Sequence, residues 1–231
     1  MQKVQIIAIL LTLPLLADDR AKEILSSTHT ERFNVASTGA VRLENSFGEV
    51  DIDGWDRPEI EVTVVRSTER LYDAKERAEA QRRLDSVHIT AKQNGNDVVI
   101  STVYPPRNVL THPLSRRSDI EISYRIRAPR ASRLIIDHNN GGVNVSDISG
   151  DIHATVTNGQ ITLTLASDRP YAIDAQSKLG EVYSDFEGRD QRRHVLGEEF
   201  TSQTPASATH LHLRVRVGDI VIAKLHGPPA D

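Results

Sequence analysis

The sequence contains no cysteine, and this absence removes several kinds of site and of stabilisation at once. Without thiols the chain has no disulfide, no thiolate metal ligand, no cysteine nucleophile and no cysteine that could carry a lipid anchor. Met1 is the only methionine, so the rest of the chain also lacks thioether ligands. We therefore expect the fold to be held by packing and backbone hydrogen bonds.

Aromatic residues are also scarce, at 4% of the chain against 38% for all hydrophobic types. The core should therefore consist of valine, isoleucine and leucine, a composition that favours strands. No apolar run after Leu16 approaches the roughly 20 residues that a membrane-spanning helix needs. The formal net charge of −4 argues against nucleic acid as a partner.

The first seventeen residues, MQKVQIIAILLTLPLLA, combine Lys3, an apolar run and a small residue at Ala17 before two aspartates. This pattern predicts a secretory signal peptide at residues 1–17, with an uncleaved membrane anchor as the alternative. Export to the periplasm or to the cell surface would follow. We expect a polar tether at 18–32, one β domain at 33–226 and a tail at 227–231.

Apolar and polar residues alternate along most of the chain, as in half-buried strands. The alternation begins near Phe33 and recurs at Val41 and Leu43, Val50 and Ile52, Ile60 to Val64, Val87 to Ala91, and Ile120 to Ile126. Between Tyr72 and Leu84 it gives way to a segment rich in Ala, Glu and Arg, without Gly or Pro. This segment predicts one helix that covers an edge or end of the sheet. Its thin apolar stripe consists of Leu71, Ala74, Ala78 and Leu84.

Turn residues divide the strands. Asn94-Gly95 predicts a β-hairpin, because both residue types tolerate positive φ. Three prolines between Tyr104 and Ser118 predict a long surface loop.

One phrase, a glycine followed by a polar residue and then by Val or Ile, recurs along the chain. It stands at Gly48-Glu49-Val50, Gly150-Asp151-Ile152, Gly159-Gln160-Ile161, Gly180-Glu181-Val182 and Gly218-Asp219-Ile220. Self-similar phrases are typical of repeat architectures, in which each unit buries its apolar face against its neighbours. We expect an all-β fold, a right-handed β-solenoid with one short covering helix. A β-sandwich has similar turn spacing and is the alternative.

Four stretches, in this order, carry a family resemblance: SFGEVDIDGWDRPEIEV (46–62), VHITAKQNGNDVVISTVYP (87–105), YRIRAPRASRLIIDHNNGGVNVSDISGDIHATVTNGQITL (124–163) and VRVGDIVIAK (215–224). The chain resembles the bacterial family known as the "putative adhesin" domain, exported envelope proteins without an assigned biochemical function. The resemblance implies a β-helix-like stack and offers no catalytic motif. The family often repeats Asn-Gly at its bends, and the asparagine of this pair is missing before Gly180 and Gly218.

Two groups of residues could bind a metal ion. His210 and His212 are two apart on an expected strand and share a face, but Arg214 and Arg216 follow on that face and would repel a cation. His138 and His153 show no ligand spacing. The stretch GGVNVSDIS begins like a calcium-binding nonapeptide but lacks its next glycine and its aspartate. We expect no metal site.

Three further groups could carry other chemistry. Asp51, Asp53 and Asp56 could act on a glycosidic bond only if they faced each other across a cleft. Trp55 could stack on a sugar ring, although closing one end of the core is the stronger expectation. A basic group in the proline-rich loop could meet an anionic polymer, but a solvated loop is the simpler reading. This group consists of Arg107, His112, Arg116 and Arg117.

The sequence therefore predicts a non-catalytic, adhesin-like binding or scaffold module of the cell envelope, with no catalytic residue and no cofactor. Its expected partner is an envelope polysaccharide or another envelope protein, and its oligomeric state is open. Two alternatives remain: a carbohydrate-active enzyme on a β-helix, and an accessory sensor domain in envelope-stress signalling.

Overall fold

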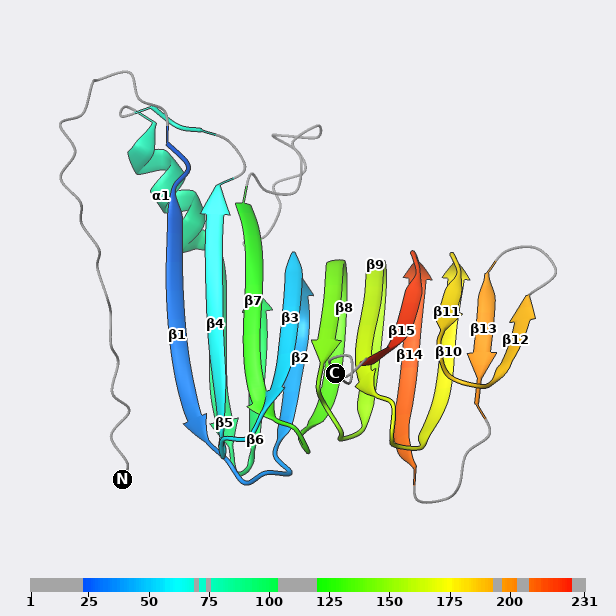
Figure 1. Cartoon of the computed structure of the whole chain (residues 1–231). Coiled ribbons are helices and arrows are strands. Elements are labelled where there is room, and N and C mark those ends of the chain that lie inside the picture. The colour runs from blue at the N-terminus through cyan, green and yellow to red at the C-terminus, as the bar shows by residue number, and fades with distance from the viewer. Residues whose placement is uncertain are drawn as a thin grey trace, which may run out of the picture.

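The computed structural model describes residues 23–68, 71–73, 76–103, 120–192, 197–202 and 208–225. The expected signal peptide at 1–17, the proline-rich loop and the tail at 227–231 lie outside these residues. Within them the fold is all-β, with fifteen strands in one open sheet and a single helix (Figure 1). The expected fold class is confirmed at this level.

The strands lie in two tiers, which we name after their first strands. The β5 tier contains, in hydrogen-bonded order, β5 (His88–Asn94), β6 (Asp97–Val103), β2 (Ala40–Phe47), the first part of β8 (Arg133–Ser146), the first part of β9 (Ile152–Ala166), β14 (Thr209–Val217), β10 (Tyr171–Leu179), β13 (Glu198–Thr201) and β12 (Arg189–Arg192). The β1 tier contains β1 (Ser26–Asn34), β4 (Glu59–Thr68), β7 (Ile120–Pro129), β3 (Glu49–Trp55), the second parts of β8 and β9, β15 (Ile220–Leu225) and β11 (Val182–Ser184). Because β8 and β9 run through both tiers, all fifteen strands belong to one sheet.

The centre of each tier is parallel and its outer strands are largely antiparallel. Strands β8 and β9 pair in parallel from Leu134–Ile152 to Ser146–Thr164. At one end, β5 pairs antiparallel with β6, and β4 and β1 follow β7 in antiparallel order. At the other end, β13 and β12 add an antiparallel pair to β10. The polar, loosely patterned segment after Phe186 is thus where the parallel order of the β5 tier ends.

A β5-tier strand and the β1-tier strand that follows it along the chain form a unit, and glycines stand at the bends within these units. At Gly159 φ is +147°, and a Cβ would lie 1.8 Å from the carbonyl oxygen of Gly141 in the neighbouring unit. Only glycine combines this backbone conformation with such a close approach. Neighbouring bends make the same contact in a row, the glycine row, of Gly48, Gly141, Gly159, Gly218 and Gly180. The recurring phrase marks the bends at Gly48, Gly159, Gly180 and Gly218, whereas its copy at Gly150 lies at another turn, against the carbonyl of Ser132.

The order of units in space differs from their order in the chain. Along the stack the units are β6–β7, β2–β3, β8, β9, β14–β15 and β10–β11. The first unit of the chain thus lies between the second and the third. The last unit, β14–β15, lies between β9 and β10–β11.

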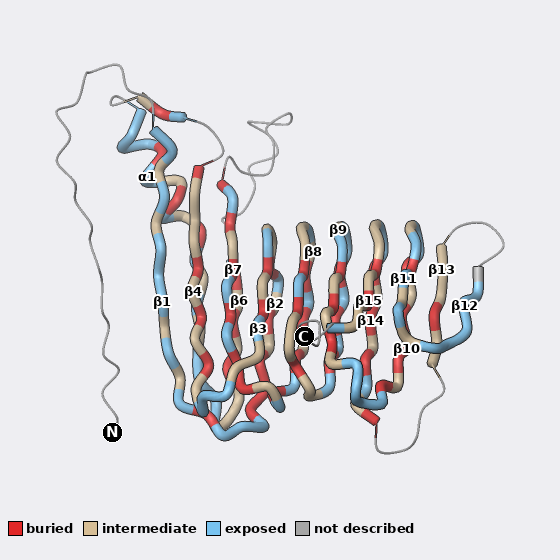
Figure 2. Tube along the Cα trace, in the orientation of Figure 1, coloured by how far each residue is buried: buried red, intermediate tan, exposed pale blue. Residues whose placement is uncertain are grey.

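The apolar side chains of the core lie between the two tiers. Buried residues alternate with less buried ones along most of the strands (Figure 2). The core is rich in Val, Ile and Leu, as the composition predicts. It also contains polar pairs, such as Thr102 of β6 and Tyr124 of β7, whose hydroxyls lie 2.6 Å apart. Burial raises the pKa of Tyr124 to about 12, although its hydrogen bonds to Thr102 and the Phe47 backbone act in the opposite direction.

The predicted helix exists, but it begins later than expected. Helix α1 spans Arg77–Ser86 and packs on β4 through Ala80 and Leu84, while Leu71 and Ala78 of the expected stripe are exposed. Arg66 of β4 donates hydrogen bonds to the carbonyls of Leu84 and Val87 at the helix end. Within the described residues, no helix has the length and apolar character needed to cross a membrane.

One expectation about local structure is revised, and another is confirmed with its turn one residue further along the chain. Strand β1 begins at Ser26 and pairs with β4 along its whole length, so residues 26–32 are not a tether. Most of their side chains are polar and exposed, as is common on an edge strand. The segment therefore lacks the alternation by which the other strands were predicted. The predicted hairpin is confirmed between β5 and β6. Its two central residues are Gly95 and Asn96, and of these only Gly95 has positive φ.

Candidate binding surface

The polar residue of the recurring phrase faces outward in each unit, so the phrase places a row of polar side chains on the β1 tier. Val50 pairs with Val143, and Ile161 pairs with both Val143 and Ile220. The residues immediately before these therefore also become neighbours across the strands. This polar row consists of Glu49, Gln160, Asp219 and Glu181, and Gly142 occupies the corresponding position on β8.

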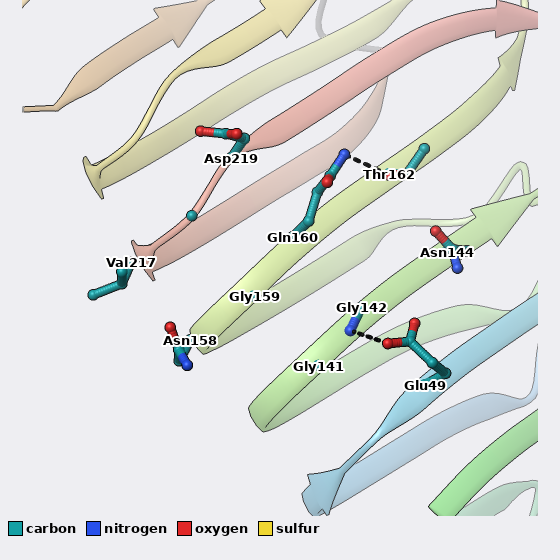
Figure 3. Close-up of a pocket in the computed structure, with 11 residues that line it drawn as sticks. Glu49, Gly141, Gly142, Asn144, Asn158, Gly159, Gln160, Thr162, Val217 and Asp219 are labelled. Atoms are coloured by element: carbon teal, nitrogen blue, oxygen red, sulfur yellow. Dashed lines mark hydrogen bonds between the residues drawn. The ribbon is translucent and has the colours of Figure 1, made fainter.

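The polar row borders an open depression of about 660 Å³ beside the glycine row (Figure 3). Its lining residues come from β3, β8, β9 and β14 and from the bend between β14 and β15. They are Glu49, Gly141, Gly142, Asn144, Asn158, Gly159, Gln160, Thr162, Val217, Gly218 and Asp219. The depression thus spans four neighbouring units of the stack.

Hydrogen bonds hold most of the lining side chains in place. The amide of Gly142 donates to Glu49 Oε1 at 3.2 Å, and Gln160 Nε2 donates to Thr162 Oγ1 at 3.3 Å (Figure 3). Asn158 Nδ2 donates to Oδ1 of Asn140 on the neighbouring strand at 2.7 Å. Groups that are fixed before a ligand arrives lose less conformational entropy on binding.

The chemistry of the lining favours a neutral, hydroxyl-rich ligand. Side-chain amides supply both donors and acceptors, and carboxylates accept hydrogen bonds from hydroxyl groups. Glu49 and Asp219 are the ionisable lining residues, and both are acidic. A polyanion would meet repulsion here without a compensating arginine or lysine.

The two histidines of β14 share a face, as predicted, but they do not converge on one point. The ring of His212 stacks on His153 of β9, with centroids 4.5 Å apart, and its Nδ1 lies 3.1 Å from Asp174 Oδ2. His210 instead donates its backbone N–H to Asp151 Oδ1. Among the described residues, no three His, Asp or Glu side chains are placed so that they could hold a metal ion.

The stacked histidines belong to a charged group on the outer face of the β5 tier. Burial lowers the pKa of His153, and the positive charges of His212 and Arg214 lower it further. Burial alone would raise the pKa of Asp174, but its hydrogen bonds and charge interactions with Arg214 and His212 bring it below the usual value. Asp174 thus pairs with Arg214 and contacts His212 within the sheet surface.

The three aspartates that could have acted on a glycosidic bond, Asp51, Asp53 and Asp56, do not face each other across a cleft. Each of them contacts a neighbouring segment instead. Asn144 Nδ2 donates to Asp51 Oδ1 at 3.0 Å, and the Ser146 hydroxyl donates to Asp53. Asp56 forms an ion pair with Arg130. These contacts bridge β3 to β8 and fix a turn, so they account for the three carboxylates structurally.

Trp55 ends β3 and is half-buried. Its indole N–H donates to the carbonyl of Glu59 at 2.8 Å, and the guanidinium groups of Arg57 and Arg127 lie 5.1 Å and 5.8 Å from the ring centre. The ring is thus occupied by local contacts. The basic group Arg107, His112, Arg116 and Arg117 lies outside the described residues.

Sequence reasoning missed the lining of the depression, although a signal for it was present. Gln160 and Asp219 each follow a bend glycine in the recurring phrase, as Glu49 does. Aligning the copies of the phrase would have identified this position as a shared outward row. Asn144, by contrast, carries no local signal, because it reaches the depression only through the pairing of β8 with β9.

Comparison with solved structures identifies a protein of similar fold. The chain is similar to a "putative cell adhesion protein" from Clostridium sporogenes, with a TM-score of 0.51 and 12% identity, over 88% of this chain and 100% of that one. Two other structures, described as "putative adhesin", come from Bacteroides fragilis (TM-score 0.28) and Parabacteroides distasonis (TM-score 0.23). Each is 10% identical over 86% of this chain and 97% of the other, and TM-scores this low support no further argument.

No family model matches the sequence. A search of curated proteins also returns no match. The adhesin resemblance that the sequence motifs suggest therefore rests on the fold, which this chain shares with the clostridial protein.

Proposed function

We propose that this protein is a non-catalytic, exported binding module of the bacterial cell envelope, and that its β1 tier binds an envelope polysaccharide. The observation that carries the proposal is the depression beside the glycine row. It presents fixed amides, hydroxyls and carboxylates from four neighbouring units. The fold shared with the clostridial cell adhesion protein supports a binding role.

The proposal includes a solenoid architecture. The parallel pairing of β2–β3, β8, β9 and β14–β15 and their common bend are features of stacked coils. A sandwich would instead be built from antiparallel strands. Stacked coils present long surfaces, and these suit an extended polymer. We treat residues 33–226 as one domain, to which β1 adds an edge strand.

The enzyme alternative meets a geometric obstacle. Glu49 on β3 and Asp219 before β15 are the two carboxylates that line the depression. They are separated by three strand spacings, because β8 and β9 lie between them. At about 4.8 Å per spacing this is about 14 Å. Glycosidase carboxylates lie about 5 to 9.5 Å apart, so this pair suits binding better than catalysis.

A glycan array probed with the full chain tests the ligand class. We expect signals on neutral, hydroxyl-rich polymers. Combining Asn144→Ala with Gln160→Ala should weaken this binding about tenfold, which corresponds to 1.4 kcal/mol. Thr155→Ala is the matched control, because Thr155 is exposed on β9 but belongs to the β5 tier. If the chain binds none of the polysaccharides on the array, the proposed ligand is wrong and a protein partner should be sought instead.

Export can be tested separately. Residues 1–17 fused to a reporter enzyme should carry it out of the cytoplasm, and replacing two leucines of the apolar run by arginine should stop the transfer. A reporter that stays in the cytoplasm with the intact segment would contradict the proposed localisation.

A further inference from the structure

The last unit of the chain is inserted between two units that precede it in the sequence. Strand β14 pairs in parallel with β9 on one side and with β10 on the other. Strand β15 pairs with β9 and β11 in the same way. Both sides of this unit are therefore paired with chain segments that were synthesised before it (Figure 1).

The inserted unit is deeply buried. Leu211, Leu213 and Ile220 are at most 1% exposed. At its bend, Gly218 touches Gly159 on one side and Gly180 on the other, so the glycine row passes through it without a break. The position between β9 and β10–β11 is thus a slot that fits one strand, one glycine bend and a second strand.

The walls of the slot also match each other. Leu211 pairs with Ile152 on one side and Ile173 on the other, and Leu213 pairs with Ala154 and Ala175. The two walls run parallel and point their apolar residues into the same core. The slot is therefore specific for a strand of this direction and alternation, and no feature of it distinguishes the chain's own last unit from that of a second copy.

We infer that β14–β15 of one molecule can occupy the slot between β9 and β10–β11 of a second copy, giving a reciprocally exchanged dimer. Such an exchange restores the strand pairing and the core contacts of the inserted unit, because each copy supplies the same unit to the same slot. Exchange requires the unit to leave its slot, and it is therefore favoured during refolding at high protein concentration. This inference is independent of the proposed ligand.

The absence of cysteine allows a direct test with single-cysteine variants of the full chain. Thr164 of β9 and Ala223 of β15 are register partners on the outer face of the β1 tier. Register partners on adjacent parallel strands are close enough to form a disulfide. When a Thr164→Cys protein and an Ala223→Cys protein are unfolded and refolded together under oxidising conditions, this pair comes into register only in molecules whose last unit has exchanged.

We expect the two variants to form a disulfide-linked dimer. The control mixes Thr164→Cys with Thr90→Cys, because Thr90 is exposed on β5 and does not neighbour β9. The yield of linked dimer should be severalfold higher than in this control. A double Thr164→Cys, Ala223→Cys protein, oxidised as a monomer before mixing, should form no exchanged dimer on size-exclusion chromatography. Linkage no higher than in the β5 control, or a dimer without the disulfide between positions 164 and 223, would overturn the inference.

Discussion

The imidazole of His138 on β8 and the hydroxyl of Ser46 on β2 lie 2.7 Å apart, and both side chains are fully buried. Ser46 stands at an irregularity in the pairing of the two strands, next to Asn45, whose φ is +54°. Burial lowers the pKa of His138 to about 4, because hydrogen bonding with the backbone of Asn140, Gly141 and Gly48 offsets only part of the desolvation cost. The core thus contains a histidine that folding keeps neutral.

This histidine should make the protein sensitive to mild acid. An unfolded histidine binds a proton near pH 6.5, whereas folded His138 does so only near pH 4, so stability falls as the pH drops between these values. From pH 7 to pH 5 the loss from this group should be about 2 kcal/mol. Urea unfolding at both pH values measures it. His138→Asn, which cannot be protonated, should remove that part of the loss, and an unchanged pH dependence would refute the assignment.

The glycine row predicts a large difference between two glycine substitutions. Gly159→Ala would place a Cβ 1.8 Å from a backbone oxygen that cannot move without displacing β8, so we expect a loss of at least about 4 kcal/mol. Gly95→Ala changes a glycine that also has positive φ, but its Cβ would meet nothing within 4 Å. Its cost should be about 1 to 2 kcal/mol. Equal losses in urea unfolding would mean that the bends are not in tight contact.

The sequence predicted those parts of the fold that depend on local patterns. Alternation identified most strands, Asn94-Gly95 located the hairpin, and the recurring phrase marked bends at Gly159 and Gly218. Helix α1 was found as well, although its start was placed too early because Glu and Arg favour a helix on both sides of Arg77.

The order of the units could not be predicted in this way. The units share the same alternation and a similar bend. No local pattern therefore predicts that β14 lies between β9 and β10, although β10 follows β9 in the chain. The copies of the recurring phrase could have identified the members of the polar row, but not which of them are neighbours. Gln160 and Asp219 become neighbours only through the pairing of β9 with β15, which depends on the order of the units.

Burial along β14 predicts how two apolar truncations differ. Leu213 is fully buried between the tiers, so Leu213→Ala should cost about 2 to 5 kcal/mol. Val217, which continues the alternation of apolar residues along β14, is 40% exposed beside the bend. Val217→Ala should therefore change stability by less than about 0.5 kcal/mol. Thermal and urea unfolding compare the two variants, and a large loss for Val217→Ala would show that the bend is covered in solution.

The buried hydroxyls of Thr102 and Tyr124 predict a non-additive pair of substitutions. Tyr124→Phe leaves the Thr102 hydroxyl buried without its partner, and an orphaned group of this kind costs about 1 to 3 kcal/mol. Thr102→Val should cost less, because the Tyr124 hydroxyl keeps its hydrogen bond with the Phe47 backbone. The double variant removes both ends of the bond that joins β6 to β7. Its loss in urea unfolding should therefore be smaller than the two single losses added, by about 1 kcal/mol. Strict additivity would mean that the two hydroxyls contribute independently and that this bond does not help to hold the tiers together.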